Sequence, residues 1–271
     1  MIKPVRWGVL GCAKIAVERV MPAMPDANVT TLTAVASRSL SKAQRVAAQF
    51  DVPKAYGSYE ALLADPEIET VYIPLPNGLH AEWSIRALRA GKHVLCEKPL
   101  TMDADEARAV QAVREETGLY CLEAFAFRFN PVVARAFEVA QSGVLGDLRF
   151  MHTVSTFLMD RPYDPTNVRL RADIGGGALY DMGCYAINAQ RMLAGREPRS
   201  VWATMTWSER FDVDMSGTAI LDFGDDLRGT IQWGFNAPYG GPFSVVGKAG
   251  RLTGTYGWGP PAGEPAMILV T

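Results

Sequence analysis

Hydrophobic and polar residues follow two different rhythms along the chain, and the rhythm changes near residue 122. In the first part, short apolar runs alternate with longer stretches in which apolar residues recur every three or four positions. Short apolar runs are typical of buried parallel strands, and the longer stretches are typical of the helices that cover them. The sequence therefore predicts a parallel sheet with helices on both faces. Strands are expected at residues 5–11, 31–36, 70–73, 94–96 and 120–122, and helices at residues 12–24, 41–50, 60–64, 80–90 and 103–117.

The second part begins with an aromatic segment at residues 123–131 and then becomes rich in strands. The turn Gly224-Asp225-Asp226 indicates antiparallel pairing of the strands beside it. One face of this sheet is expected to be aromatic, and either helices of the chain or a second subunit would bury it. The aromatic residues concerned are Trp202, Trp207, Trp233 and Phe235. Strands are expected at residues 148–157, 200–207, 217–223, 228–235, 243–247 and 267–271, and a helix at residues 132–142.

The charge and composition of the chain narrow its possible partners. The 271 residues carry a formal net charge of −2, and no run of basic residues occurs, so we expect no nucleic-acid partner. No apolar run reaches membrane-spanning length, so no membrane is expected either. The first strand starts almost at the N-terminus, so we expect no signal peptide. The 4 cysteines and 3 histidines lack metal-ligand spacing, so we expect a cytoplasmic protein with free thiols and no metal.

The most informative turn follows the strand at residues 94–96, where the sequence continues Glu97-Lys98-Pro99. Proline has no N–H for a sheet ladder, so the strand must end near Lys98. The carboxyl ends of strands are where α/β domains bind ligands, and an ammonium group there is a candidate for catalysis. The alternative is a surface turn with two solvated charges.

The first strand runs into a loop whose small residues suit a dinucleotide. Gly11, Ala13 and Ala16 stand where the three glycines of a G-x-G-x-x-G fingerprint would be, just before a helix. A pyrophosphate can approach such a helix N-terminus closely. The alternative is an ordinary strand–turn–helix. The candidate cofactor-binding residues of this loop are Gly11, Cys12, Ala13, Lys14 and Ile15.

The end of the second strand favours NADP over NAD. NAD-binding domains usually carry a carboxylate there, which binds the ribose 2′-hydroxyl, whereas this chain has Ser37 and Arg38. A guanidinium group pairs well with a 2′-phosphate. Lys42, one turn into the next helix, adds charge to the same pocket. The alternative for Arg38 is a solvated charge at a strand end.

The third strand ends in Pro74-Leu75-Pro76-Asn77, a loop stiffened by two prolines. Asn77 is therefore predicted to lie at the mouth of the cofactor cleft, and Pro74, Leu75 and Asn77 are candidate cofactor-binding residues. His80 opens the next helix and is either a fourth residue of this cleft or a helix cap.

A second informative stretch lies in the second part of the chain. Gly175, Gly176 and Gly177 permit positive φ or a close backbone approach just before a helix. In that helix, Asp181 and Tyr185 are four residues apart, so they project from one face. A carboxylate beside a phenol is a candidate proton-handling pair, and the alternative is a half-buried hydrogen bond between the two.

Together these motifs resemble the Gfo/Idh/MocA oxidoreductases, in particular the branch with glucose-fructose oxidoreductase, NADP-dependent xylose dehydrogenase and dimeric dihydrodiol dehydrogenase. The resemblance covers essentially the whole chain, and its specific part is Glu97-Lys98-Pro99 combined with Asp181 and Tyr185. It implies a Rossmann domain at residues 1–122. It also implies a substrate-binding and dimerisation domain at residues 123–271, with a large, mostly antiparallel open sheet. Members generally continue further, so this domain is expected to be truncated or to close unusually.

By the same resemblance, Lys98 corresponds to the active-site lysine, and Asp181 and Tyr185 to the acid and the phenol. Glu97, Lys98 and Arg128 complete the predicted cofactor-binding set. The implied function is NADP-dependent hydride transfer to or from a sugar or sugar-like alcohol, in a homodimer. The alternatives are a trans-dihydrodiol dehydrogenase or dicarbonyl reductase, and a regulator that binds NADP without chemistry.

Overall fold

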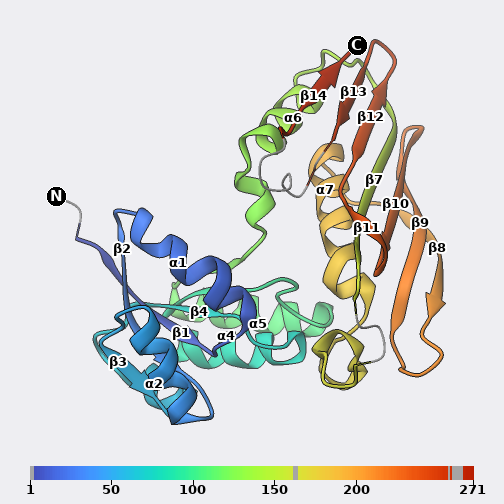
Figure 1. Cartoon of the computed structure of the whole chain (residues 1–271). Helices are drawn as coiled ribbons and strands as arrows, with labels where there is room; N and C mark the ends of the chain where they lie inside the picture. The colour runs from blue at the N-terminus through green and yellow to red at the C-terminus, as the bar shows by residue number, and fades with distance from the viewer. Residues whose placement is uncertain (1–2, 161–163, 256, 258–264) are drawn as a thin grey trace. The chain divides into compact units, whose positions relative to one another are not determined.

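The computed structural model describes residues 3–160, 164–255, 257 and 265–271, which form two compact units (Figure 1). The first unit is Met1–Ala124 and the second is Phe125–Thr271. The polar, proline-containing segment 159–171 suits either a lid or a long surface connection by its sequence, and part of it lies outside the described residues.

The first unit is built on a six-stranded parallel sheet with the order β3-β2-β1-β4-β5-β6. Because β1 pairs with both β2 and β4, the strand order reverses there, as it does at the ligand-binding edge of doubly wound sheets. The strands are β1 Val5–Leu10, β2 Thr30–Ala36, β3 Lys54–Tyr56, β4 Thr70–Ile73, β5 His93–Cys96 and β6 Cys121–Glu123.

Both faces of this sheet are buried, which explains the continuous apolar runs in its strands. In β4, Val71 and Ile73 pack into one core cluster, whereas Tyr72 between them packs into the cluster on the opposite face. The helices of this unit are α1 Met21–Ala23, α2 Leu40–Gln49, α3 Tyr59–Leu63, α4 His80–Arg89 and α5 Ala104–Thr117.

The helix predicted at residues 12–24 is broken into three pieces. A π-helical turn, η1 (Ala16–Val20), leads into α1 and then into a 3₁₀ turn, η2 (Met24–Asp26). Pro22 and Pro25 lie in the two later pieces, and a proline provides no N–H for a continuous helix. The strand β3, which has only three residues, was not predicted by the apolar pattern.

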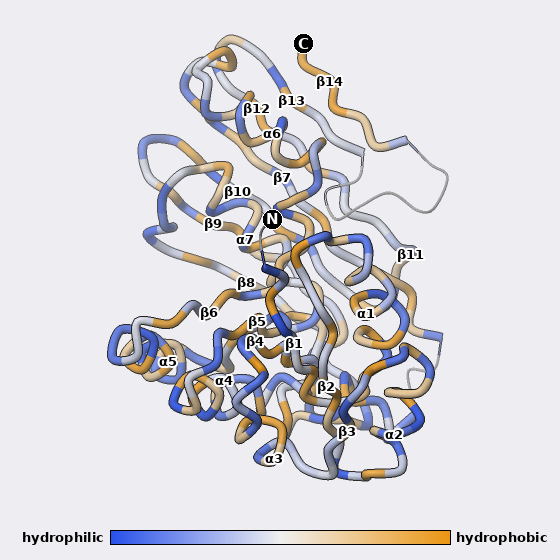
Figure 2. The backbone as a smooth tube through the Cα atoms, turned by 90° about the vertical axis from the view of Figure 1, so that its left-hand side faces the viewer, coloured by the Kyte–Doolittle hydropathy of each residue, from blue (hydrophilic) through white to orange (hydrophobic). Residues whose placement is uncertain are grey.

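The second unit is built on an eight-stranded sheet. Seven of its strands follow the order β14-β13-β12-β7-β10-β9-β8, and the eighth, β11, pairs with β7 outside this order. All its pairings are antiparallel except β7 with β10. Figure 2 shows β14 as hydrophobic along its length, which agrees with the strand predicted there. The strands are β7 Leu148–Leu158, β8 Ser200–Trp207, β9 Asp214–Gly224, β10 Leu227–Gly234, β11 Asn236–Gly240, β12 Phe243–Gly247, β13 Arg251–Gly254 and β14 Ile268–Val270.

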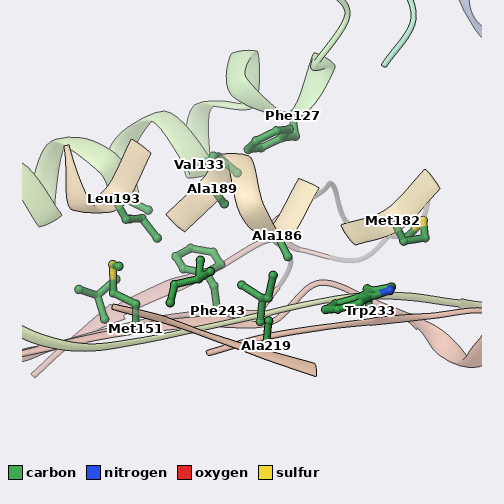
Figure 3. Packing of buried hydrophobic residues seen from close by; sticks show 14 of the residues in the cluster. Phe127, Val133, Met151, Met182, Ala186, Ala189, Leu193, Ala219, Trp233 and Phe243 are labelled. Atoms are coloured by element: carbon green, nitrogen blue, oxygen red, sulfur yellow. The ribbon is translucent and has the colours of Figure 1, made fainter. Parts of the chain in front are cut away.

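Two helices, α6 (Pro131–Gln141) and α7 (Cys184–Ala194), belong to this unit. The side chains of α7 pack on one face of the sheet, as Figure 3 shows for Ala186, Ala189 and Leu193 above Met151 and Ala219. The turn between β9 and β10 has Asp225 and Asp226 at positive φ, as expected for a tight hairpin. The predicted antiparallel pairing is confirmed.

The four aromatic residues predicted to share one sheet face do not share it. Trp233 and Phe235 are buried in the core, at 3% and 2% exposure. Trp202 is 63% exposed and lies opposite Ile220, one residue out of phase with the buried positions of β9. The prediction was wrong because a one-residue offset between paired strands moves a side chain to the opposite face.

Candidate active site

The Glu97-Lys98-Pro99 turn directly follows β5 and lies beside the end of β4. Cys96 pairs with Ile73, and the Glu97 N–H donates to the Ile73 carbonyl over 3.0 Å. The Glu97 carboxylate accepts the hydroxyl of Tyr72 at 2.6 Å and the Lys98 backbone N–H at 3.3 Å. Since Tyr72 is fully buried, it anchors Glu97 from the sheet interior. Glu97 thus fixes the turn that presents Lys98.

His80 holds the same turn from the neighbouring helix. It is fully buried at the start of α4, with Nδ1 2.7 Å from the Pro99 carbonyl oxygen and Nε2 2.7 Å from that of Leu75. Burial lowers the pKa of the His80 imidazole, and its contacts with these two carbonyls act in the opposite direction. The ring therefore joins the loop after β4 to the loop after β5.

The loop after β1 turns through a backbone conformation that favours glycine. Gly11 has φ of 114°, and its N–H donates to the Ala36 carbonyl over 2.9 Å. Lys14 and Ile15 are exposed, whereas Ala16 is fully buried under the first helical turn. The loop therefore leaves its outer side open to a ligand while its helix packs inward.

Cationic side chains gather where this loop meets the end of β2. Burial raises the pKa of the Cys12 thiol. This pKa is lowered by the charge of Lys42, by a hydrogen bond with Ser37 and by the charge of Arg45. Arg45 is new to the site, and its spacing of three residues from Lys42 on α2 is the signal that could have found it.

Arg38 lies beside the Tyr59 phenol. Burial raises the pKa of that phenol, whereas the charge of Arg38 and its hydrogen bond act in the opposite direction. With Lys42 and Arg45, this guanidinium gives a set of cations that fits a 2′-phosphate.

In the second unit, a π-helical turn, η7 (Leu179–Gly183), carries Asp181 and continues into α7, which carries Tyr185. Arg169 Nε donates to Asp181 Oδ2 over 2.5 Å. The Tyr185 ring lies edge-on to Phe125 at 5.5 Å and tilted against Phe127 at 5.8 Å. Asp181 is thus oriented by a cation and Tyr185 by aromatic rings.

The glycines before this helix allow two close approaches, as predicted. A Cβ on Gly176 would meet the carbonyl oxygens of Arg169 and Arg171, each at 2.7 Å. Gly177 has φ of 110°, and a Cβ there would collide with Asp214 Oδ1. Any larger side chain would push the loop away from these groups.

Asp214, which the sequence did not single out, holds the start of the helix. Its Oδ2 accepts the Leu179 backbone N–H and the Trp233 indole N–H, each at 2.8 Å. Burial raises the pKa of Asp214, and these donors act in the opposite direction. A carboxylate at a helix N-terminus is favourable because the helix dipole is positive there.

The structure thus places the predicted residues in two groups. Lys98 belongs to the first unit with the cofactor-loop residues, and Asp181 and Tyr185 belong to the second. Arg128 is exposed on a short turn, η4 (Ala126–Phe129), in the second unit. Within the described ranges, no cluster of three or more His, Cys, Asp or Glu side chains is arranged to hold a metal ion. Among the same residues, no helix is both long and apolar enough to cross a membrane.

The fold and the site together define an oxidoreductase whose chain has a dinucleotide-binding domain and a second structural unit. Residues 5–125 match the model of an oxidoreductase family with an NAD-binding Rossmann fold, GFO_IDH_MocA, and residues 133–253 match the C-terminal domain of the same family. The chain belongs to the GFO/IDH/MocA family, so the predicted family and fold class are confirmed.

Two curated relatives show the range of the family. The chain is 41% identical to the D-xylose 1-dehydrogenase (NADP(+)) 2 of Haloferax volcanii, over 91% of this chain and 74% of that one. It is 34% identical to the trans-1,2-dihydrobenzene-1,2-diol dehydrogenase of Bos taurus, over 90% of this chain and 72% of that one.

A solved structure of similar fold contains the predicted cofactor. The 3-ketoreductase KijD10 from Actinomadura kijaniata, in complex with NADP and TDP-benzene, aligns with a TM-score of 0.88 and 35% identity, over 99% of this chain and 81% of that one. These relatives confirm the prediction of an NADP-dependent oxidoreductase.

Proposed function

We propose that the chain transfers hydride between NADP and a carbinol or hemiacetal carbon of a sugar, as an aldose 1-dehydrogenase does. The observation that carries this proposal is the Glu97-Lys98-Pro99 turn, held by Tyr72 and His80 at the carboxyl edge of the parallel sheet. Ligands of doubly wound domains bind at that edge. The similarity to a xylose dehydrogenase supports a sugar as the substrate.

NADP is the cofactor in this proposal. Arg38, Lys42 and Arg45 would hold its 2′-phosphate, and the loop that begins at Gly11 would face its pyrophosphate. The predicted contacts of Pro74, Leu75, Asn77 and Arg128 with the cofactor belong to the same proposal. When bound, NADP supplies the hydride acceptor or donor.

The proton is handled by side chains of the chain itself. When the substrate carbon loses hydride, its hydroxyl proton passes to the Tyr185 phenolate oxygen, and the resulting phenol returns the proton in the reverse reaction. A phenol, with a pKa near ~10, is a poor base at neutral pH unless a cation favours the phenolate. We assign the role of this cation, and the polarisation of the substrate oxygen, to Lys98. Asp181 orients the substrate hydroxyls.

The first experiment is a nicotinamide absorbance assay in both directions. It crosses NADP and NAD with xylose, glucose, a trans-dihydrodiol and a 2-ketoaldehyde. Turnover of a sugar with NADP supports the proposal, and turnover of only the diol or the ketoaldehyde moves the substrate to the dihydrodiol branch. Tight NADP binding without any turnover would favour the regulator and reject the enzyme mechanism.

We also propose that the chain forms a homodimer through the exposed face of the second sheet. Trp202 on β8 and Ile220 on β9 lie opposite each other with 63% and 42% of their surfaces exposed. Exposed apolar residues clustered on a sheet face are typical of interfaces. Light scattering should show a dimer that Trp202→Lys separates. Val201→Lys, on the opposite face of the same strand, should leave it intact.

The cytoplasm is the location we propose. Cys12, Cys96 and Cys121 are free thiols, as expected in a reducing compartment.

A further inference from the structure

The Arg169 side chain contacts the carboxylate of Asp181. Arg169 belongs to a short 3₁₀ turn, η5 (Val168–Leu170), in the polar segment before the three glycines. Its Nε lies 2.5 Å from Asp181 Oδ2, in a pair whose side chains are 44% and 16% exposed. The carboxylate is therefore the more enclosed partner.

The backbone of Arg169 is fixed by contacts that do not involve Asp181. Its N–H donates to Asn167 Oδ1 over 3.1 Å, and its carbonyl accepts the Gly177 N–H at 2.8 Å. The guanidinium also lies 5.4 Å from the centroid of the Phe157 ring on β7. These contacts fix the position of the guanidinium independently of its contact with the Asp181 carboxylate.

One residue therefore contacts both ends of the segment that carries the candidate acid. The Arg169 carbonyl binds the last glycine before the helix, and the Arg169 side chain binds Asp181 one turn further on. A charge-assisted hydrogen bond is shorter and stronger than a neutral one, and it favours the ionised carboxylate. A fixed carboxylate loses less entropy when it binds a substrate hydroxyl.

We propose that Arg169 is a positioning residue that acts through Asp181, holding its carboxylate aimed for the substrate hydroxyls. This inference rests on the proposed function, because it takes Asp181 to be a substrate contact. Arg169 itself is not assigned a contact with the reacting atoms.

The chain offers a matched control two residues further along. Arg171 donates to the Asp173 carboxylate from Nε at 3.2 Å and from Nη2 at 2.5 Å. This pair is also exposed, at 49% and 63%, but Asp173 lies outside the helix of Asp181. The two arginines therefore have similar local chemistry, and only Arg169 binds the candidate acid.

The test compares Arg169→Ala, Arg169→Lys and Arg171→Ala with the unmodified chain, using the sugar that it turns over. We expect Arg169→Ala to lower kcat/KM about tenfold, a loss discounted for the exposure of the arginine, with unchanged NADP affinity. Arg169→Lys should recover part of this loss, since it restores the charge without the planar guanidinium. Arg171→Ala should stay within about twofold of the unmodified chain.

A double-mutant cycle with Asp181→Asn separates positioning from a general structural role. If Arg169 acts through Asp181, adding Arg169→Ala to Asp181→Asn should cause little further loss. Calorimetric binding of the sugar to the NADP complex provides a second measurement for variants with slow turnover. It should show the same lack of additivity.

Three results would overturn the inference: equal activities of Arg169→Ala and Arg171→Ala, fully additive losses in the cycle, or faster turnover in Arg169→Ala. Failure of the proposed function has a different signature. In that case Asp181→Asn itself leaves turnover and sugar binding unchanged, or the unmodified chain neither binds nor converts a sugar. That result removes the substrate contact through which Arg169 is proposed to act, and so it also rejects the inference.

Discussion

The two units hold their candidate catalytic side chains in different ways. In the first unit, the turn carrying Lys98 is fixed by Tyr72 and His80, which are both fully buried. In the second, Asp181 is held by Arg169, whose side chain is 44% exposed, and the buried Asp214 fixes only the start of the helix. Buried contacts are costly to break, whereas exposed ion pairs contribute little to stability. We therefore expect variants of the turn that carries Lys98 to lower stability and turnover together. Variants of the Arg169–Asp181 pair should lower turnover with little loss of stability.

The largest effect should come from the proposed reacting groups, one in each unit. Lys98→Met and Tyr185→Phe should each lower kcat by about a thousandfold, since proton transfer by a positioned group contributes on the order of 10²–10⁴-fold. Tyr120→Phe is the control, because Tyr120 is a phenol with 65% exposure at the edge of the first sheet. Steady-state kinetics and circular dichroism would show the loss in a folded chain. Unchanged turnover in both variants would rule out the mechanism.

Asp214 tests the buried support of the second unit. Asp214→Ala leaves the Leu179 N–H and the Trp233 indole N–H without their acceptor, which should cost about 3 kcal/mol of unfolding free energy. Asp173→Ala, which removes an exposed carboxylate before the same helix, should cost almost nothing. Denaturant titration followed by Trp fluorescence measures both. Equal losses would mean that Asp214 does not anchor the helix.

The cation cluster of the first unit tests cofactor choice. Arg38→Ala should raise the KM for NADP about tenfold or more and leave the KM for NAD nearly unchanged, because only NADP carries the 2′-phosphate. Arg45→Ala should show the same preference with a smaller change. Arg19→Ala, on η1, is the control for a lost surface charge. Parallel losses with both cofactors would argue against a 2′-phosphate pocket.

Tyr72 tests whether the buried contacts of the first turn serve catalysis as well as stability. Tyr72→Phe removes the hydroxyl that donates to Glu97, and we expect a loss of about 1–2 kcal/mol and a severalfold lower kcat. Tyr56→Phe is the matched control, since that hydroxyl donates to the Asp65 carboxylate over 2.8 Å. It should lose stability without losing kcat. If Tyr72→Phe and Tyr56→Phe had a similar kcat, the hydrogen bond from Tyr72 to Glu97 would serve stability and not catalysis.

The difference between the units also explains what the sequence could predict. Continuous apolar runs predicted the doubly wound sheet, and the glycines at 175–177 predicted the close approach before the helix, because both signals are local. Asp214 and Arg169 were not found, because Asp214 meets Leu179 across 35 residues and Arg169 meets Asp181 across 12. No local pattern records such a contact. The assignment of Trp202 and Trp233 to one face failed for the same reason, since the offset between two strands decides it.

The smallest effect concerns pH and the buried histidine of the first turn. Burial lowers the pKa of His80 in the folded chain, so below its ordinary value near 6.5 the unfolded chain binds a proton that the folded chain does not. The folded state therefore keeps its full stability above about pH 6.5. It loses stability as the pH falls from the ordinary pKa of histidine toward the lower pKa of His80 in the folded chain. The loss should be at most about 1 kcal/mol per pH unit.

His80→Gln keeps polar atoms near the carbonyls of Leu75 and Pro99 but does not titrate in this range. Urea titrations of both chains between pH 7 and pH 5 should show the unmodified chain losing stability faster than the variant. His93→Gln, at the start of β5, is the control for a histidine outside the turn. If the unmodified chain instead gained stability relative to His80→Gln on acidification, the two carbonyls would outweigh burial. His80 would then hold the Lys98 turn as an imidazolium, a buried cation donating to both loops.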